Sequence, residues 1–232
     1  MPALRLSIIV PVLNEASGIE AILASLTGLR RAGCEAIVVD GGSSDDTVAR
    51  ATPLCDQLIE STRGRAAQMN AGAFAARTAL LLFLHADTRL PPGALDAIEA
   101  AMRGRAPAWG RFDVRLDSPR ASLALVGAMM NLRSRLTGIA TGDQALFMTR
   151  DAFERVGGFP DIALMEDVEI SARLQRLAQP VCLHLKVLTS ARRWETRGVL
   201  ATVVLMWCLR LAYFLGASPE ALARRYRWRP DQ

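Results

Sequence analysis

The stretch ALLLFLHADTRLP, residues 79–91, decides the fold of this chain. Its first six residues, 79–84, are all apolar, and such a run predicts a central parallel strand that is buried on both faces. The prolines and the glycine at 91–93 end this segment and start a helix. Ligands of open α/β sheets bind beyond the carboxyl ends of strands, which is where Asp87 is expected. A carboxylate there can bind a hard cation, although a solvated turn or a helix N-cap would also explain Asp87.

Short apolar runs alternate with helical patterns on the N-terminal side of this stretch. Strands are expected at 6–10, 36–39 and 57–60, a helix from Ser17 to Gly33, and a helix of small residues that ends near Arg77. This rhythm of strand and helix predicts an α/β fold with a Rossmann-like, mostly parallel central sheet flanked by helices.

The second half of the chain changes character. Residues 109–116 alternate between polar and apolar, which predicts a half-exposed strand. Further elements are expected as helices at 119–136, 151–157 and 165–177 and as strands at 145–149 and 181–188. No internal repeat or low-complexity linker divides the chain, so a single domain is favoured.

The composition describes a globular chain of 232 residues with 51% hydrophobic and 22% charged residues. Its net charge is +5, and Lys186 is the only lysine, so the basic character is almost entirely arginine. Arginine in excess suits phosphate groups or an anionic surface. None of the four cysteines belongs to a CxxC pair, which predicts reduced thiols in a cytoplasmic protein and no zinc site. The N-terminus shows no signal-peptide pattern.

Two segments point to a nucleotide. Asp40 ends the second expected strand, where an acid commonly accepts hydrogen bonds from a base or a ribose, although an ordinary turn acid would also fit. Arg63, Arg65 and Asn70 belong to a basic loop that enters a helix, and a helix N-terminus with an arginine attracts phosphate. A solvated loop remains the alternative. No glycine follows the first strand in PVLNEAS, 11–17, which argues against a dinucleotide site of the GxGxxG type.

Two further segments carry candidate chemistry. Glu166, Asp167 and Glu169 lie at a helix start, where one can act as a general base. The helix macrodipole would also explain them, at about 0.3–1 kcal/mol each. The preceding Gly-Gly-Phe-Pro loop favours a ligand. Arg193 and Trp194 pair a cation with an aromatic ring, which a snorkelling arginine beside a half-buried tryptophan would equally produce.

The order of these segments resembles a family 2 glycosyltransferase, and more narrowly the short group of radical-SAM/selenodomain-associated glycosyltransferases. The motifs that carry the resemblance are PVLNE at 11–15, VDGGSSDDT at 39–47, RGRAAQMNAG at 63–72, LHAD at 84–87, GDQALF at 142–147, GGFPDIALMED at 157–167 and ARRW at 191–194. The resemblance implies a glycosyltransferase A fold, a nucleoside-diphosphate sugar donor and a hydroxyl acceptor. It also implies a divalent metal, Mn²⁺ or Mg²⁺, and inversion at the anomeric carbon by single displacement.

Carried over by position, the resemblance implies a role for each matching residue. The donor side comprises Pro11, Asn14, Glu15, Asp40, Arg65, Asn70, His85 and Asp87, the last as the metal ligand; Asp167 is the base beside Glu166; Asp143, Gln144, Arg193 and Trp194 lie on the acceptor or diphosphate side. Two positions depart from the family. His85 replaces the first Asp of the DXD motif, and Ser190 stands where the QxxRW pattern has Gln, so polymer synthesis is not inferred.

Two other classes remain as alternatives. A nucleotidyltransferase shares acidic metal ligands on an α/β sheet, but it often has a glycine-rich loop after the first strand, and that loop is missing here. A non-catalytic nucleotide-sugar-binding protein finds support only in His85 and Ser190. A nucleic-acid binder is disfavoured, because no basic run with stacking aromatics occurs outside the short tail.

The resemblance divides the chain into a catalytic part, 1–195, and a C-terminal helical segment of the same domain, 196–232. That segment begins with an apolar run at 199–209, which Arg210 interrupts at a cost of about 2.5–3.5 kcal/mol for insertion, so a transmembrane helix is not expected. Packing in the core and contact with a membrane or a partner both remain open. The basic stretch RRYRWR, 224–229, suits an anionic membrane surface, where a lipid-linked acceptor would fit. The expected location is the cytoplasm, and a peripheral position at the inner face of the membrane is the alternative that membrane contact would bring.

Overall fold

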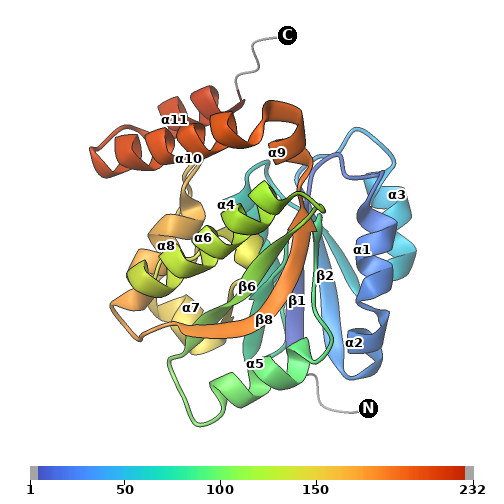
Figure 1. Cartoon of the computed structure of the whole chain (residues 1–232). Coiled ribbons are helices and arrows are strands. Elements are labelled where there is room, and N and C mark those ends of the chain that lie inside the picture. Colours follow the sequence, from blue (N-terminus) through green and yellow to red (C-terminus); the bar gives the residue numbers. More distant parts are fainter. Residues whose placement is uncertain (1–4, 228–232) are drawn as a thin grey trace.

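The computed structural model describes residues 5–227, in which eight strands form one sheet (Figure 1). The strand order is β3-β2-β1-β4-β7-β6-β8-β5. The strands are β1 Leu6–Val12, β2 Cys34–Asp40, β3 Gln57–Glu60, β4 Leu80–Phe83, β5 Thr88–Arg89, β6 Trp109–Asp117, β7 Phe147–Thr149 and β8 Val181–Ser190. The helices are α1 Ile19–Ser25, α2 Thr27–Arg31, α3 Thr47–Ala51, α4 Arg65–Ala75, α5 Ala94–Met102, α6 Ala121–Thr137, α7 Arg150–Arg155, α8 Glu166–Gln175, α9 Arg192–Arg197, α10 Val199–Phe214 and α11 Pro219–Arg227, with short 3₁₀ turns at Thr52–Leu54 and Gly142–Gln144.

The strand expected from the opening stretch, β4, lies in the middle of the sheet between β1 and β7. Strands β3, β2, β1 and β4 are parallel to one another, with Ser7 opposite Leu81. Beyond β4 the sheet is mixed, because β7 runs antiparallel to both β4 and β6 whereas β6 and β8 are parallel. The α/β prediction is therefore confirmed, and the parallel arrangement holds for the half of the sheet that contains β1 to β4.

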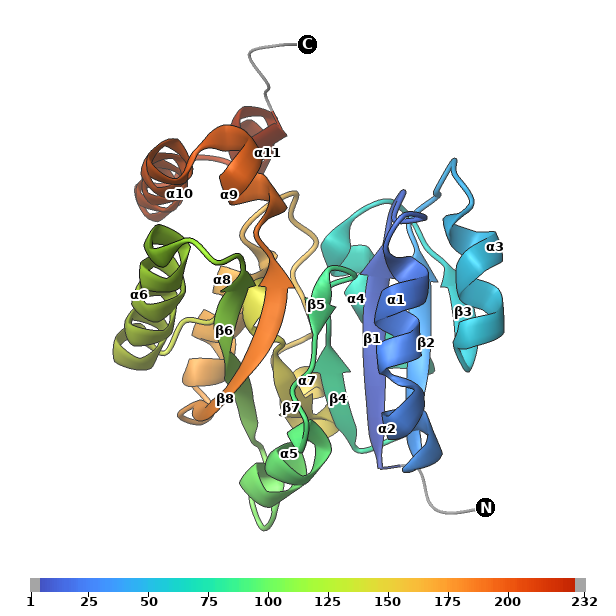
Figure 2. The same cartoon turned by 45° about the vertical axis from the view of Figure 1, so that its right-hand side comes forward.

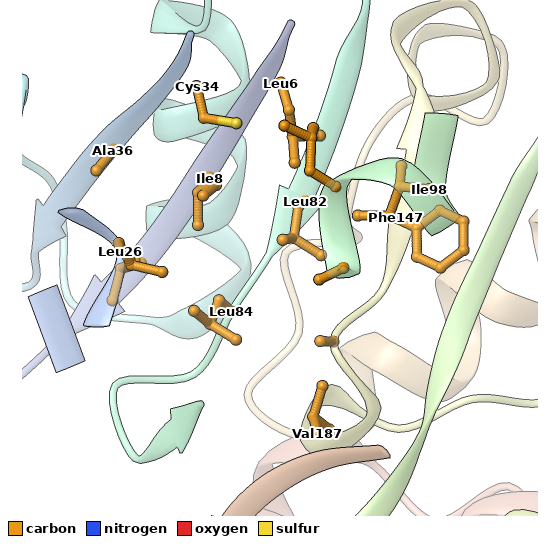
Figure 3. Packing of buried hydrophobic residues seen from close by; sticks show 14 of the residues in the cluster. Leu6, Ile8, Leu26, Cys34, Ala36, Leu82, Leu84, Ile98, Phe147 and Val187 are labelled. Carbon is orange, nitrogen blue, oxygen red and sulfur yellow. The ribbon is translucent and has the colours of Figure 1, made fainter. Parts of the chain in front are cut away.

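Side chains alternate between two core layers along each central strand, as the pleat of a strand requires. Figure 3 shows one layer, in which Leu6 and Ile8 of β1, Leu82 of β4 and Phe147 of β7 pack against Ile98 of α5. The opposite layer contains Ile9, Ile37, Val39, Leu81 and Phe83, packed against residues of α4, α7 and α8. Helices thus cover both faces of the sheet (Figure 2), which is why its central strands are apolar on both sides.

Gly72 explains how closely α4 approaches the sheet. A Cβ atom at this position would overlap the side chain of Ile9 and press on that of Val39. The helix therefore lies directly against β1 and β2, and its first residue, Arg65, is fixed near their carboxyl ends.

Three local expectations were wrong. The helix expected from Ser17 to Gly33 is two helices, because the chain breaks at Leu26 between α1 and α2, and Gly18 rather than Ser17 is the N-cap. The strand expected to be half-exposed, β6, is mostly buried, since β8 and α6 cover it. The strand expected at 145–149 begins only at Phe147, because Ala145 adopts a left-handed φ of 47°.

The C-terminal helices α9, α10 and α11 lie together above α6 and α8 (Figures 1 and 2). Leu209 of α10 and Leu222 of α11 pack around Met165, just before α8, so one side of α10 joins the body of the protein. The other side of α10 is exposed, with Trp207 at 72% and Phe214 at 86% exposure. No helix within residues 5–227 has both the length and the apolarity of a membrane span. The boundary near residue 195 stays a prediction, and residues 228 and 229 of the basic stretch lie outside the described residues.

Candidate functional site

The loops that follow β1 and β2 are joined by Asn14. Its Oδ1 accepts a hydrogen bond from the backbone N–H of Ser44 at 2.8 Å, and its own N–H donates to Oγ of Ser43 at 2.9 Å. Asn14 has a φ of 55°, a left-handed conformation that asparagine tolerates better than most residues. Pro11 lies just before this loop, opposite Val39 in β2. The two loops therefore form one connected rim at the carboxyl edge of the sheet.

Asp40 ends β2 and organises the second loop. Its Oδ2 accepts the backbone N–H groups of Gly42 and Ser43, both at 2.9 Å, and its Oδ1 accepts the hydroxyl of Ser43. A carboxylate has about four acceptor positions, so these bonds leave part of its capacity free. Contact of Asp40 with a base stays a prediction.

Glu15 and Asp87 form the acidic side of this edge. Burial, and next the charge of Asp87, raise the pKa of Glu15, whereas Arg192 and Arg65 act against that shift. Asp87 is exposed, and its carboxylate accepts a hydrogen bond from Thr88 Oγ1 at 3.2 Å. The backbone carbonyl of Asp87 accepts the N–H of Ser190 at 3.1 Å, which ties this turn to the end of β8. Asp87 therefore has a fixed backbone and a carboxylate open to a ligand.

The acidic pair Glu166 and Asp167 opens α8, as the sequence indicated. Met165 precedes it with a φ of 73° and serves as the N-cap. Glu166 is only 5% exposed, and its Oε1 lies 3.9 Å from Nη1 of Arg65 at the start of α4. Burial and the neighbouring charge of Asp167 raise the pKa of Glu166, whereas Arg65 opposes the shift. The close packing of α4 against the sheet at Gly72 thus places Arg65 beside Glu166, although the two residues are 101 positions apart in the sequence.

Two backbone hydrogen bonds orient Asp167. Its Oδ2 accepts the N–H of Gly142 at 2.9 Å, and its Oδ1 accepts that of Val168 at 2.7 Å. Asp167 also lines a small pocket with Glu166, His85 and Phe83, whose free volume is about 10 Å³, the space for one water molecule. The carboxylate is therefore held in place at the wall of a small, mainly apolar pocket.

His85 lies between Asp143 and Gly142. Its Nδ1 is 3.4 Å from Oδ1 of Asp143. Burial acts to raise the pKa of Asp143, but the hydrogen bond and charge of His85, helped by Arg193 and Arg65, lower it to about 2. The other edge of the ring contacts Gly142 so closely that a Cβ atom there would overlap it. His85 therefore connects the segment just after β4 to the turn that orients Asp167.

Three of the expected site residues make contacts that hold neighbouring segments of the protein. Asn70 donates to the carbonyl of Phe159 at 2.8 Å and accepts its N–H at 2.9 Å, which holds the loop before α8. Gln144 is fully buried and donates to Oγ of Ser134 at 3.0 Å. Trp194 packs into an apolar cluster with Leu116 and Leu123. Ligand contacts of these three residues stay predictions; in the structure they position neighbouring segments.

Arginines of the ARRW motif and two arginines from outside the motifs lie among these acids. Arg192 acts on Glu15, and Arg193 acts on both Asp143 and Asp87 while its guanidinium lies 4.7 Å from the ring centre of Tyr226. The motifs did not indicate Arg133 of α6 and Arg210 of α10, and the charges of Asp167 and Asp143 act on both of these arginines. Arg210 carried one usable signal in the sequence, because a charged residue inside an apolar helix needs a polar environment.

The donor atoms at this edge fit a divalent cation only in part. Within residues 5–227 no three His, Cys, Asp or Glu side chains come together as a complete metal site. Mg²⁺ and similar ions are commonly bound by one or two carboxylates together with substrate phosphates. Asp87, whose carboxylate is exposed and lightly bonded, fits such a shared site.

Solved structures of glycosyltransferases have the same fold. A mannosyltransferase from Pyrobaculum calidifontis aligns with a TM-score of 0.63 and 22% identity over 90% of this chain and 61% of that one. Residues 1–349 of TarS from S. aureus align with a TM-score of 0.63 and 16% identity, covering 81% of this chain and 61% of that structure. Glucosyl-3-phosphoglycerate synthase from Mycobacterium tuberculosis aligns with a TM-score of 0.59 and 17% identity, over 78% and 70%. This chain therefore has the glycosyltransferase A fold and spans about three fifths of the first two chains.

Similarity in sequence leads to the same family. A glycosyltransferase of Mycobacterium tuberculosis is 31% identical over 194 residues, covering 77% of this chain and 71% of its relative. The model of glycosyl transferase family 2 matches residues 7–154, which include β1 to β4, Asp87, Asp143 and the start of α7. The chain belongs to the family 2 glycosyltransferases and is a glycosyltransferase enzyme.

Proposed function

We propose that this enzyme transfers a sugar from a nucleoside-diphosphate donor to a hydroxyl acceptor by a single, metal-dependent displacement with inversion. The observation that carries the proposal is the acidic pair that opens α8. Glu166 contacts Arg65, and Asp167 is oriented by the N–H of Gly142 in the turn that His85 and Asp143 hold. Solved relatives in fold were obtained with UDP-GlcNAc, with GDP-Man and Mn²⁺, and with UDP and Mn²⁺, which supports a nucleotide-sugar donor.

The donor occupies the edge formed by the loops after β1 and β2. Pro11, Asn14 and Asp40 line the nucleoside end of this site, and the diphosphate lies toward Asp87. Asp87 would hold Mn²⁺ or Mg²⁺ together with diphosphate oxygens, and the ion would supply positive charge next to the leaving group. Arg65 and Arg193 add fixed positive charge, which stabilises the nucleoside diphosphate as negative charge develops on it.

The acceptor hydroxyl attacks the anomeric carbon from the side of Asp167. Asp167 takes the proton of that hydroxyl as the new C–O bond forms and the bond to the diphosphate breaks. Its two backbone hydrogen bonds hold the carboxylate in one orientation before the reaction, which lowers the cost of reaching the transition state. Glu166 keeps Arg65 in place at 3.9 Å. One displacement inverts the configuration, and no covalent intermediate forms.

The enzyme also works at an anionic membrane surface in this proposal. Exposed apolar side chains on the outer side of α10 are accompanied by exposed arginines of α11, Arg224 and Arg225. Apolar side chains with nearby cations are the combination that binds anionic lipid surfaces. A lipid-linked acceptor would meet the enzyme there, on the cytoplasmic face.

A thermal-shift screen of nucleotide sugars with and without Mn²⁺ first identifies the donor. We then expect Asp167→Asn to lower transfer by at least about a hundredfold, in the range of general-base contributions, while the calorimetric donor affinity stays within about twofold. Asp87→Ala should weaken Mn²⁺-dependent donor binding instead. Asp161→Asn, at an exposed acid before α8, is the matched control and should change neither quantity.

Two results would contradict these assignments. Loss of donor affinity in Asp167→Asn would place Asp167 on the donor side. The second result is a donor affinity that does not depend on Mn²⁺ in either the wild type or Asp87→Ala. It would show that Asp87 does not bind a metal for the donor.

A further inference from the structure

Two arginines enter the site from helices that the donor motifs do not include. Arg133 lies on α6 and Arg210 on α10, and both views of the fold place α10 above α6 (Figures 1 and 2). Both side chains are half-buried, and the carboxylates that act on them are Asp167 and Asp143. The two guanidinium groups therefore face the side of the site that holds the base.

Arg133 lacks partners for its buried atoms. Its Nε and Nη2 are inaccessible to solvent, and no acceptor within residues 5–227 takes a hydrogen bond from either. A buried donor without an acceptor costs about 1–3 kcal/mol, and more when the group is charged. Such a group is expected to have an acceptor in at least one functional state of the protein.

The electrostatics of the pair favour an anion. Burial, and next the positive charge of Arg210, lower the pKa of Arg133 to about 10, and burial lowers the pKa of Arg210. Both groups nevertheless stay protonated at neutral pH, so two like charges meet in a poorly solvated place. An anion between them would satisfy the free N–H groups and offset the repulsion, and a planar guanidinium binds phosphate in a bidentate manner.

This positive pair shares Asp143 with the donor-side arginines but differs from them in its other acids. On the donor side, Asp87, Arg192 and Arg65 act on Glu15, and Asp87 also acts on Arg193, so the acids there are Glu15 and Asp87. Neither of them is among the charges that act on Arg133 or Arg210. An anion bound by the pair would lie next to Asp167, where the acceptor hydroxyl must be.

We propose that Arg133 and Arg210 bind a phosphate group carried by the acceptor, next to the base that activates its hydroxyl. This inference rests on the proposed function and narrows the acceptor class to phosphate esters. The outer sides of the same two helices carry exposed apolar residues, namely Leu125, Met129 and Leu132 on α6 and Leu200, Trp207 and Phe214 on α10. The phosphate can therefore belong to a lipid headgroup or to a soluble ester.

Calorimetry without nucleotide tests the proposal by measuring the affinity of the protein for three probes. The second and third probes each lack one feature of the first. Dodecanoyl-glycerol 3-phosphate has a hydroxyl, a phosphate and a tail; glycerol 3-phosphate lacks the tail; dodecanoyl-glycerol lacks the phosphate. We expect the wild type to bind a phosphate-bearing probe at least about tenfold more tightly than the neutral one, the effect of one or more charged hydrogen bonds. Binding of only the tailed phosphate identifies a lipid headgroup, and equal binding of both phosphates identifies a soluble ester.

Variants then assign that binding to the pair. Arg133→Gln and Arg210→Gln should each weaken phosphate binding at least about tenfold, whereas Arg133→Lys should retain part of it. Arg105→Gln, which removes one exposed charge in the loop between α5 and β6, should leave it unchanged. A thermal melt of each variant identifies those that fail to fold, and for these the corresponding variant, Arg133→Lys or Arg210→Lys, decides.

Donor binding separates this inference from the proposed function. Affinities for UDP and GDP with Mn²⁺ should be the same in the wild type and in both glutamine variants. An equal loss of nucleotide and phosphate affinity would assign the pair to the donor diphosphate and overturn the inference. Absence of phosphate binding in the wild type, or unchanged binding in both variants, would also overturn it. Absence of UDP and GDP binding in the wild type would speak against the proposed function alone.

Discussion

Gly142 provides the sharpest test of the site geometry, because a single methyl group there meets the ring of His85. The φ of Gly142 lies in the range that other residues adopt, so Gly142→Ala brings no backbone strain, only the added Cβ. The His85 side chain is 16% exposed and is held at Asp143, so it has little room to withdraw. Either the ring or the turn at 142–144 must move, and overpacking of this kind costs about 1–3 kcal/mol.

A movement of the turn would also disturb Asp167, the carboxylate that we propose as the base. The N–H of Gly142 donates to Oδ2 of Asp167 at 2.9 Å, a hydrogen bond to a charged group. A shift of about 1 Å in such a contact can lower a rate by about a hundredfold. We therefore expect Gly142→Ala to lower the free energy of unfolding by about 1–3 kcal/mol, to lower Tm by about 2–12 °C, and to lower transfer more than donor binding.

A double-mutant cycle in urea tests the cause of this loss. His85→Ala removes the ring, so the further change Gly142→Ala should cost less than about 0.5 kcal/mol in that background. Gly28→Ala is the matched control, because a Cβ there meets nothing within 4 Å, and it should be neutral or stabilising by up to about 1 kcal/mol. An equal loss of stability from Gly142→Ala with and without the His85 ring would refute the contact as described.

Two further predictions concern charge and the outer surface. Burial raises the pKa of Glu166 above 4.5, so the folded chain keeps this proton to a higher pH than the unfolded chain, and stability is lost as pH rises from 4.5 through the folded value. The free energy of unfolding in urea should therefore fall with rising pH in the wild type, and Glu166→Gln should remove a part of that fall. Glu154→Gln, which changes an exposed acid, should retain it. An equal dependence of the unfolding free energy on pH in all three proteins would contradict the burial argument. On α10, the triple change Leu200→Ser, Trp207→Ser and Phe214→Ser should weaken co-sedimentation with anionic vesicles by more than about tenfold, since each side chain offers up to about 1.5–3 kcal/mol of apolar burial. Phe74→Ser, which changes a similarly exposed residue on α4, should leave co-sedimentation unchanged. A wild-type protein that does not bind such vesicles would contradict the proposed contact with a membrane.

The local sequence determined much of the fold because its signals are local. The apolar run at 79–84 is short and has no polar face, which predicts a strand covered on both sides, and β4 indeed lies in the middle of the sheet. Motif order predicted the family, which the match to its model confirms. The carboxyl ends of β1, β2 and β4 predicted a ligand site, and that site stays a prediction. The break at Leu26 escaped prediction because the apolar spacing continues across it.

The tertiary structure decided what each side chain contacts. Asn70 and Gln144 share motifs with Arg65 and Asp143, yet the structure turns the first two toward the backbone of Phe159 and the hydroxyl of Ser134. It also turns one side of α10 inward and leaves the other exposed. Nothing in the local pattern separates these outcomes, because hydrophobic periodicity reports that a face is apolar and not what will cover it.

Arg133 and Arg210 show the same limit most clearly. They are 77 residues apart in the chain, by their numbers in the sequence, and each alone is an ordinary helical arginine. The sequence determined that these charges exist and that Arg210 interrupts an apolar helix. Only the packing of α10 above α6 brings both charges to Asp167 and Asp143, because burial and the neighbours of a charge depend on contacts between segments that are distant in the chain.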